Sequence, residues 1–394
     1  MELLGKGVLY IIMLCAASSA VVSVIDEESE FGKKFTEGIY AIGPIFLPVA
    51  GIMALIPILS DSISWLLEPF YEFVGADKAM AATTLIAVDM GGYSLAAELA
   101  SAKESWIMAM ITGYMAGATI VFSVPVGLKM VAKEDWQYMA LGVMAGMMAI
   151  PFGFLVSCLC IFFNPLMVRS VISTDSAADY LLHFTLPLIF YNSIPLFIFC
   201  ILIAWGLWKQ TDRMIAGFSL LGACMEKCLR LVVMLAIVEY FTHVFSSVLG
   251  FWPLDPLIAD DRDITRALEV AGYIGIMLAG AFPMVYLLQK IMSKAVGRSK
   301  IFSGRNADLF SGILAAAANI LALFAMVKDL QPREKVLCIA FGVCGAFMFG
   351  DHLAFTANFQ PNLIVPVLLG KTAGGFLAVY FAHVIVKHRQ TGKK

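Results

Sequence analysis

Apolar residues occur along this chain in long runs that are separated by short polar or charged segments. The hydrocarbon core of a bilayer is about 30 Å thick, and a helix needs roughly twenty apolar residues to cross it. The pattern predicts an all-α, polytopic membrane protein with about nine transmembrane helices. Two stretches of mixed polarity, 61–74 and 214–230, are expected to lie at the interface as amphipathic helices. The nine apolar runs are 3–25, 38–60, 105–128, 137–163, 181–208, 231–251, 265–289, 336–358 and 363–386.

Two further apolar segments are interrupted by polar residues or glycine. The first, 79–100, contains Asp89-Met90-Gly91-Gly92, and the second, 309–327, has Asn319 at its middle. Each is long enough to cross the membrane or to enter it and return.

The loop charges favour re-entrant hairpins at 77–101 and 307–328. The second segment is flanked by basic loops at 290–305 and 328–335. A full crossing would put one of these loops outside, whereas Lys and Arg prefer the cytoplasmic side. The same rule places the N-terminus outside and both Arg298 and the C-terminus inside. The two hairpins then enter from opposite faces.

Small residues recur with matching spacing in the two halves of the chain. Gly113-x-x-x-Gly117 is followed after 29 residues by Gly142-x-x-x-Gly146, and Gly342-x-x-x-Ala346 is followed after 28 residues by Gly370-x-x-x-Gly374. Membrane helices pack closely through such pairs, and hairpins of opposite entry are typical of an inverted repeat. The expected organisation is an N-terminal span and polar link at 1–37, a first inverted half at 38–164, scaffold spans at 165–263, and a second inverted half at 264–394.

Composition supports the membrane assignment and excludes other classes of protein. Hydrophobic residues make up 60% and charged residues 14%, and the mean hydropathy is +0.86. A net charge of −2 without a basic block excludes a nucleic-acid partner. All eight cysteines lie in apolar segments without a CxxC pair, so we expect packing roles and neither metal nor cofactor. An intramembrane enzyme is the rival class, but no motif supplies a nucleophile and a base.

Charged groups at membrane depth are the best candidates for function, because each costs a few kcal/mol at the centre of a helix. Asp89 lies at the middle of the first hairpin, and Asp351-His352 lies within the apolar run 336–358. We expect the Asp351 carboxylate to attract a cation while His352 orients it or donates a hydrogen bond. Nearby polar residues would complete the site, and Gly91, Gly92 and Gly350 would allow the helices to break. The remaining candidate ligands are Asn319, Thr119, Ser123, Glu98, Asn192 and Asn358.

Several of these residues also have a structural interpretation. Asp89 would serve as the cap of a half-helix, and Asn192 would satisfy backbone groups freed by Pro195. Glu98 would face water. Lys371 would either neutralise Asp351 or bind anionic lipid, and the sequence does not choose between them. From the residues alone, the chain is a transporter or channel with an anionic midplane site for a small organic cation bearing a hydroxyl, or for an inorganic cation.

The motifs singled out above resemble those of the bacterial ethanolamine-utilisation membrane permease family. The similarity extends over nearly the whole chain, and Ile320 and Ala322 depart from the Asn and Pro that the family pattern leads us to expect. The segments that carry it are Leu85-Ile86-Ala87-Val88-Asp89-Met90-Gly91-Gly92, Glu98-Leu99-Ala100, Thr119-Ile120-Val121-Phe122-Ser123-Val124-Pro125, Ala140-Leu141-Gly142-Val143-Met144-Ala145-Gly146, Asn192, Leu268-Glu269-Val270, Gly350-Asp351-His352-Leu353 and Gly370-Lys371.

This resemblance implies uptake of ethanolamine across the bacterial cytoplasmic membrane, by a facilitator rather than an ATP-driven pump. An alkylamine is cationic at neutral pH, which suits an anionic site. The alternative within transport is a proton- or sodium-coupled symporter of ethanolamine or another small amine. The expected partners are ethanolamine and the lipid bilayer, and a homo-oligomer is left open.

Overall fold

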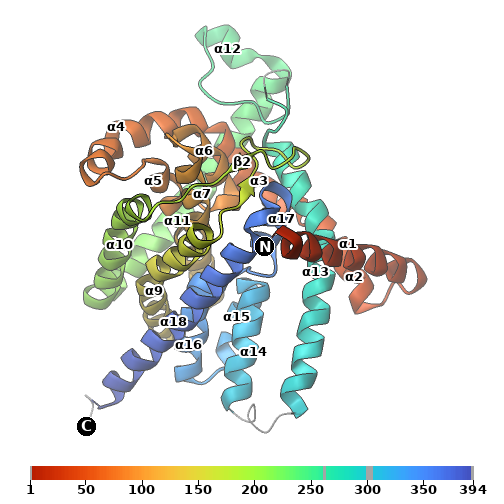
Figure 1. Ribbon diagram of the computed structural model, residues 1–394, viewed down its shortest axis with the longest axis vertical. Coiled ribbons are helices and arrows are strands. Elements are labelled where there is room, and N and C mark those ends of the chain that lie inside the picture. Colours follow the sequence, from red (N-terminus) through yellow and green to blue (C-terminus); the bar gives the residue numbers. More distant parts are fainter. Residues whose placement is uncertain (1, 261–262, 299–304, 392–394) are drawn as a thin grey trace.

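The computed structural model describes residues 2–260, 263–298 and 305–391, and most of this part of the chain is helical (Figure 1). Part of the basic segment used to assign the topology, 299–304, lies outside the described residues. Within the described part, seven helical stretches are long and apolar enough to cross a membrane. This confirms an all-α, polytopic architecture. The seven stretches are Leu3–Ile25, Glu30–Ala54, Lys103–Met130, Lys133–Phe163, Leu186–Lys209, Ala267–Met292 and Pro361–His388.

The prediction of nine continuous spans is wrong at two places. The run 231–251 does not form a helix separate from 214–230, because no helix-breaking residue divides them. Instead, both contribute to α11 (Thr211–Thr242), which α12 (Val244–Leu249) follows. Charged residues such as Glu226 and Arg230 make α11 too polar along its length to count as an apolar span.

The second error concerns the run 336–358, which is interrupted at its middle. It forms α16 (Pro332–Gly345) and α17 (Asp351–Phe359), and residues 346–350 between them form turns. Asp351 is therefore the first residue of a helix rather than a residue inside one.

Both predicted hairpin segments form two short helices joined by a break. In the first, α5 (Ala79–Leu85) is followed by the 3-10 turn η1 (Val88–Met90) and by α6 (Gly92–Leu99). In the second, α14 (Arg305–Ala318) and α15 (Ile320–Met326) are separated at Asn319. In each pair the two helices pack against one another.

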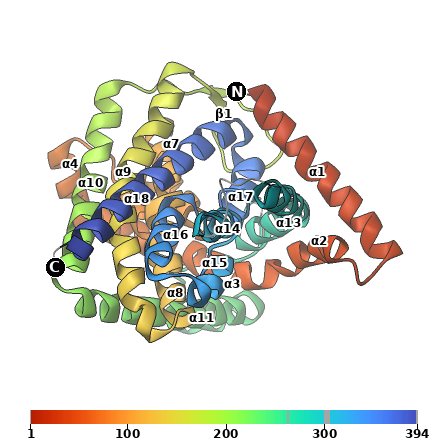
Figure 2. The ribbon, with the colours of Figure 1, turned by 90° about the horizontal axis from the view of Figure 1, so that it is seen from below.

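The most extensive helix packing joins three helices: α9 (Trp136–Phe163), α16 and α18 (Ile364–Thr391) (Figure 2). Small residues permit this packing, as their spacing predicted. A Cβ added to Gly153 of α9 would lie 3.3 Å from the Cα of Gly374 in α18, and one added to Gly146 would lie 2.3 Å from Cβ of Val343 in α16.

The remaining elements complete the fold. The helix Lys103–Met130 consists of α7 (Lys103–Thr112), the π-helical segment η2 (Gly113–Ser123) and α8 (Val124–Met130). A short antiparallel pair, β1 (Met167–Val168) and β2 (Tyr180–Leu181), was not predicted. The other elements are α1 (Glu2–Ile25), α2 (Glu30–Tyr40), α3 (Ile42–Ala54), α4 (Ile56–Val74), η3 (Lys133–Asp135), α10 (Leu186–Lys209), α13 (Ala267–Arg298), η5 (Val327–Asp329) and η6 (Pro361–Leu363).

Candidate functional site

The breaks in three helical segments meet at one cavity of about 220 Å³. Asp89 comes from the break of the first hairpin, Asn319 from that of the second, and Asp351 and His352 from the start of α17. These four predicted site residues are thus brought together, although they are far apart in sequence. The remaining lining is apolar and comes from the breaks themselves, the α2–α3 region, η2 and α13: Ala41, Pro44, Ile45, Pro48, Ala87, Met90, Ala118, Phe122, Leu278, Phe282, Leu321 and Phe347.

A tight turn presents Asp89 to this cavity. The carbonyl of Ala87 accepts hydrogen bonds from the N–H groups of Met90 (3.1 Å) and Gly92 (3.0 Å). Gly91 has φ +93°, a left-handed conformation that favours glycine. A Cβ on Gly91 would also lie 2.7 Å from Cγ2 of Ile52 in α3. The turn is therefore held by close packing, and its glycines are needed for its shape.

The break before Asp351 is held by hydrogen bonds to the second hairpin. The N–H groups of Phe347 and Phe349 donate to the carbonyls of Ala316 (3.2 Å) and Ala317 (3.0 Å), at the end of α14. Phe347 adopts φ +58°, which is uncommon for a bulky residue. A Cβ on Gly350 would lie 2.4 Å from the carbonyl oxygen of Ala318. These contacts fix where α17 begins.

Asn319 has one structural task that was not predicted. Its Oδ1 accepts a hydrogen bond from the N–H of Leu321 (2.9 Å) and so caps the N-terminus of α15. Since the oxygen is occupied, the amide N–H groups are the part of Asn319 that suits a ligand.

The carboxylates of Asp89 and Asp351 face the cavity, and neither forms a salt bridge with a described residue. Among the described residues, neither Asp89 nor Asp351 has a Lys, Arg or His nitrogen within salt-bridge distance. Neither side chain caps a helix, because the residues before α6 and α17 are Gly91 and Gly350 and no side-chain cap is present there. The capping interpretation of Asp89 therefore finds no hydrogen bond to support it.

A buried polar network lies behind His352. The Nζ atom of Lys371 is 3.0 Å from Nδ1 of His352 and donates to the carbonyl of Tyr114 (2.8 Å). The hydroxyl of Thr356 donates to the carbonyl of His352 (2.7 Å) and lies 2.5 Å from the hydroxyl of Tyr114. Lys371 is 1% exposed, so it contacts protein and not a lipid headgroup.

The other predicted ligands lie away from the cavity. Thr119 donates to the carbonyl of Val343 (3.1 Å), and with Ser123 it lines a separate void of about 10 Å³. Asn192 accepts from the N–H of Asp77 (2.8 Å) and holds the start of the first hairpin. Asn358 donates to the carbonyl of Tyr273 (2.8 Å), and Glu98 is exposed on α6.

Sequence reasoning missed the aromatic walls of the site and the residue that stabilises the far end of α17. Phe122 and Phe347 line the cavity, with ring centroids 5.8 Å apart. Arg169, next to β1, donates to the carbonyls of Asn358 (2.5 Å) and Phe359 (3.2 Å) at the C-terminus of α17. A cation there offsets the helix dipole. No local signal in the sequence links Arg169 to these carbonyls.

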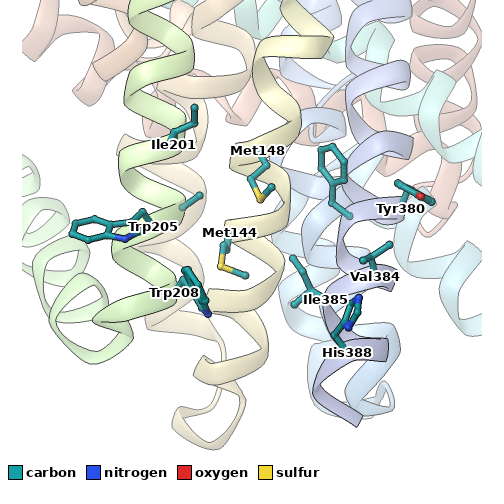
Figure 3. A pocket seen from close by; sticks show the side chains of 11 residues that line it. Met144, Met148, Ile201, Trp205, Trp208, Tyr380, Val384, Ile385 and His388 are labelled. Carbon is teal, nitrogen blue, oxygen red and sulfur yellow. The ribbon is translucent and has the colours of Figure 1, made fainter. Parts of the chain in front are cut away.

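Two other cavities help to define the site. One of about 180 Å³ shares Phe282 and Asn319 with the first and extends along α13 past Tyr286 and Gln289. A larger one, of about 670 Å³, lies between α9, α10 and α18 (Figure 3). Its lining is mainly apolar and aromatic, including Trp205 and Trp208, and contains no carboxylate. It does not suit an ammonium ion.

Comparison with known proteins gives a consistent result over almost the full length. Residues 4–385 match the family described as ethanolamine utilisation protein, EutH. Proteins named "Probable ethanolamine permease EutH" from Listeria monocytogenes and Escherichia coli are each 34% identical to this chain, covering 98% and 97% of it and 96% of each relative. An uncharacterized protein, YxeR, from Bacillus subtilis is 31% identical over 88% of the chain and 85% of its own length. No solved structure gives a significant match.

These relatives and the apolar helices together fix the class of protein. It is a multi-pass protein of the bacterial inner membrane and a permease rather than an enzyme. The chain belongs to the ethanolamine utilisation protein EutH family.

Proposed function

We propose that this protein carries ethanolamine, as ethanolammonium, into the bacterial cytoplasm by facilitated uniport through the cavity between Asp89 and Asp351. The observation that carries the proposal is the pair of carboxylates facing a small cavity with no cation at salt-bridge distance among the described residues. Two unpaired carboxylates at membrane depth are costly, and a bound ammonium ion offsets that cost. The names of the relatives supply the choice of amine.

The lining of the cavity matches each part of ethanolammonium. The ammonium group donates charge-assisted hydrogen bonds to the Asp89 and Asp351 carboxylates. The amide N–H groups of Asn319 donate to the hydroxyl oxygen. The rings of Phe122 and Phe347 pack against the two methylene groups. The volume of about 220 Å³ is below the roughly 300–1,000 Å³ of sites for drug-sized ligands, as expected for so small a substrate.

The adjoining cavity is the proposed exit to the cytoplasm. It meets the first cavity at Phe282 and Asn319 and continues past Val285, Tyr286 and Gln289 on the C-terminal half of α13. The positive-inside rule assigns that end of α13 to the cytoplasm. Entry from outside then requires a second conformation of the protein.

Flux measurements in proteoliposomes test the proposal. A uniported monocation gains about 2.3 kcal/mol per 100 mV of inside-negative potential, so labelled ethanolamine is expected to accumulate about fiftyfold at 100 mV and not at all without a potential. Recovery of unmodified ethanolamine inside the vesicles excludes obligatory conversion by an enzyme. Accumulation driven by a proton or sodium gradient at zero potential would instead establish the coupled symporter.

A further inference from the structure

Lys371 is a buried cation that the transport mechanism above does not use. It lies on α18 and is 1% exposed, and among the described residues no carboxylate is within salt-bridge distance of its Nζ atom. Its contacts are the carbonyl of Tyr114 and Nδ1 of His352, at 2.8 Å and 3.0 Å. A charged lysine at this depth is costly. Its position directly behind the wall of the proposed ammonium site suggests a role in that site.

The contacts of Lys371 are compatible with its charged form. An ammonium group has three donors and no acceptor, and both contacts offer it an acceptor. When Lys371 is protonated, Nδ1 of His352 accepts the hydrogen bond, and the imidazole is then neutral with its proton on Nε2. His352 therefore adds no charge, and Lys371 adds one positive charge.

With both carboxylates ionised and Lys371 protonated, Asp89 and Asp351 together contribute −2 and Lys371 contributes +1, which gives the empty site a net charge of −1. One ethanolammonium ion brings this to zero. A dication would leave an uncompensated positive charge in a low-dielectric environment, where repulsion is weakly screened.

We propose that Lys371 is a fixed internal cation that makes the site selective for a single monovalent ammonium ion and excludes diamines. This inference rests on the proposed function, since it concerns the selectivity of the same cavity. Lys371 acts through charge and through His352, and it is a positioning and selectivity residue that does not line the cavity.

Two probes of matched length isolate the effect of charge. 3-Aminopropan-1-ol is a monocation at neutral pH, and 1,3-diaminopropane replaces its hydroxyl with a second ammonium group. Competition of each probe against labelled ethanolamine is measured in purified full-length protein. We expect the wild-type protein to prefer the monocation by at least about tenfold. Lys371→Gln gives the site a net charge of −2 and is expected to reverse this preference.

A double variant separates selectivity from a structural role. Asp89→Asn combined with Lys371→Gln returns the net charge to −1 and is expected to restore the preference for the monocation, although with weaker binding. A residue needed only for packing would not give this reversal and recovery. Lys209→Gln, which removes an exposed positive charge outside the site, is the matched control and is expected to leave the wild-type preference unchanged.

The outcomes distinguish this inference from the proposed function. Failure of wild-type protein to bind ethanolamine would refute the proposed function. Normal ethanolamine binding with unchanged preference in Lys371→Gln, or equal competition by the two probes in the wild type, would refute the selectivity role alone. Lys371→Met, which keeps the unbranched stem, replaces the glutamine variant if that variant does not fold, and the wild-type comparison requires no variant.

Discussion

Replacing Asp89 by Asn separates its role in binding from a role in folding. The side chain lines the cavity and makes no helix cap in this structure. Asn has nearly the same shape and fits the same turn, whose hydrogen bonds are made by the backbone. Since an uncharged amide is less costly at membrane depth than a carboxylate, we expect the variant to fold.

The loss of binding can be estimated from the charge that is removed. A carboxylate and an ammonium ion about 4 Å apart attract by about 4 kcal/mol at an effective dielectric constant of about 20. A neutral hydrogen bond from Asn restores about 1 kcal/mol. The difference of about 3 kcal/mol corresponds to a dissociation constant roughly a hundredfold higher. We expect a loss of the same order for Asp351→Asn, because its carboxylate lines the same cavity.

Equilibrium binding of labelled ethanolamine to purified protein is the direct assay. A thermal unfolding curve and size-exclusion profile like those of the wild type would show that the variant is folded. Asp212→Asn, an exposed substitution in the first turn of α11, is the matched control and should bind normally. A folded Asp89→Asn protein whose dissociation constant stays within about threefold of wild type would refute the assignment and leave Asp351 as the main anion.

Three further predictions concern the framework around the site. Gly350→Ala places a Cβ 2.4 Å from a carbonyl oxygen of the second hairpin, and we expect destabilisation of about 1–3 kcal/mol and weaker binding, measured by thermal unfolding and ligand titration. Asp135 and Lys335 form a mostly buried ion pair at 2.6 Å. A neutral substitution at either position should lower the stability of the wild type more than it lowers the stability of a variant that already lacks the partner. Simple additivity in a double-mutant cycle would contradict this. Asn192→Leu removes the acceptor for the N–H of Asp77 and should lower stability by about 1–3 kcal/mol, while the folded fraction binds ethanolamine with unchanged affinity.

The parts of the site that the sequence predicted correctly have local signals. Gly91-Gly92 and Asn319 interrupt apolar runs, and the structure breaks the helices at those residues. Asp89 and Asp351 stood out because charged residues are rare in apolar runs of membrane proteins. The matching spacing of small residues in the two halves led us to expect these residues in one site.

The parts that were missed depend on contacts between distant segments. Residues 346–350 are apolar except for Gly350 and fit a continuous helix, but the N–H groups of Phe347 and Phe349 pair with the end of α14 instead. Similarly, Thr119 and Ser123 were expected at the site as polar residues of the segment that the repeat pairs with Asp351-His352. In the π-helical segment η2, Ala118 and Phe122 face the cavity, and Thr119 points to α16.

The two distortions of the helices provide the strongest reason to propose an inverted repeat. The register that pairs Gly113 with Gly342 also pairs Phe122 with Asp351. It aligns η2 (Gly113–Ser123) with residues 342–352, the segment that contains the break before α17. It places Asn319 opposite Met90, next to Asp89. Both halves therefore depart from regular α-helix at equivalent positions, by π-helix in one and by a break in the other. A continuous π-helical backbone keeps its polar groups internally bonded and presents Phe122 to the cavity, whereas the break presents the charged end of a new helix at Asp351. We propose that this difference between the halves gives a symmetric framework an asymmetric site, with an apolar wall facing one of its two carboxylates.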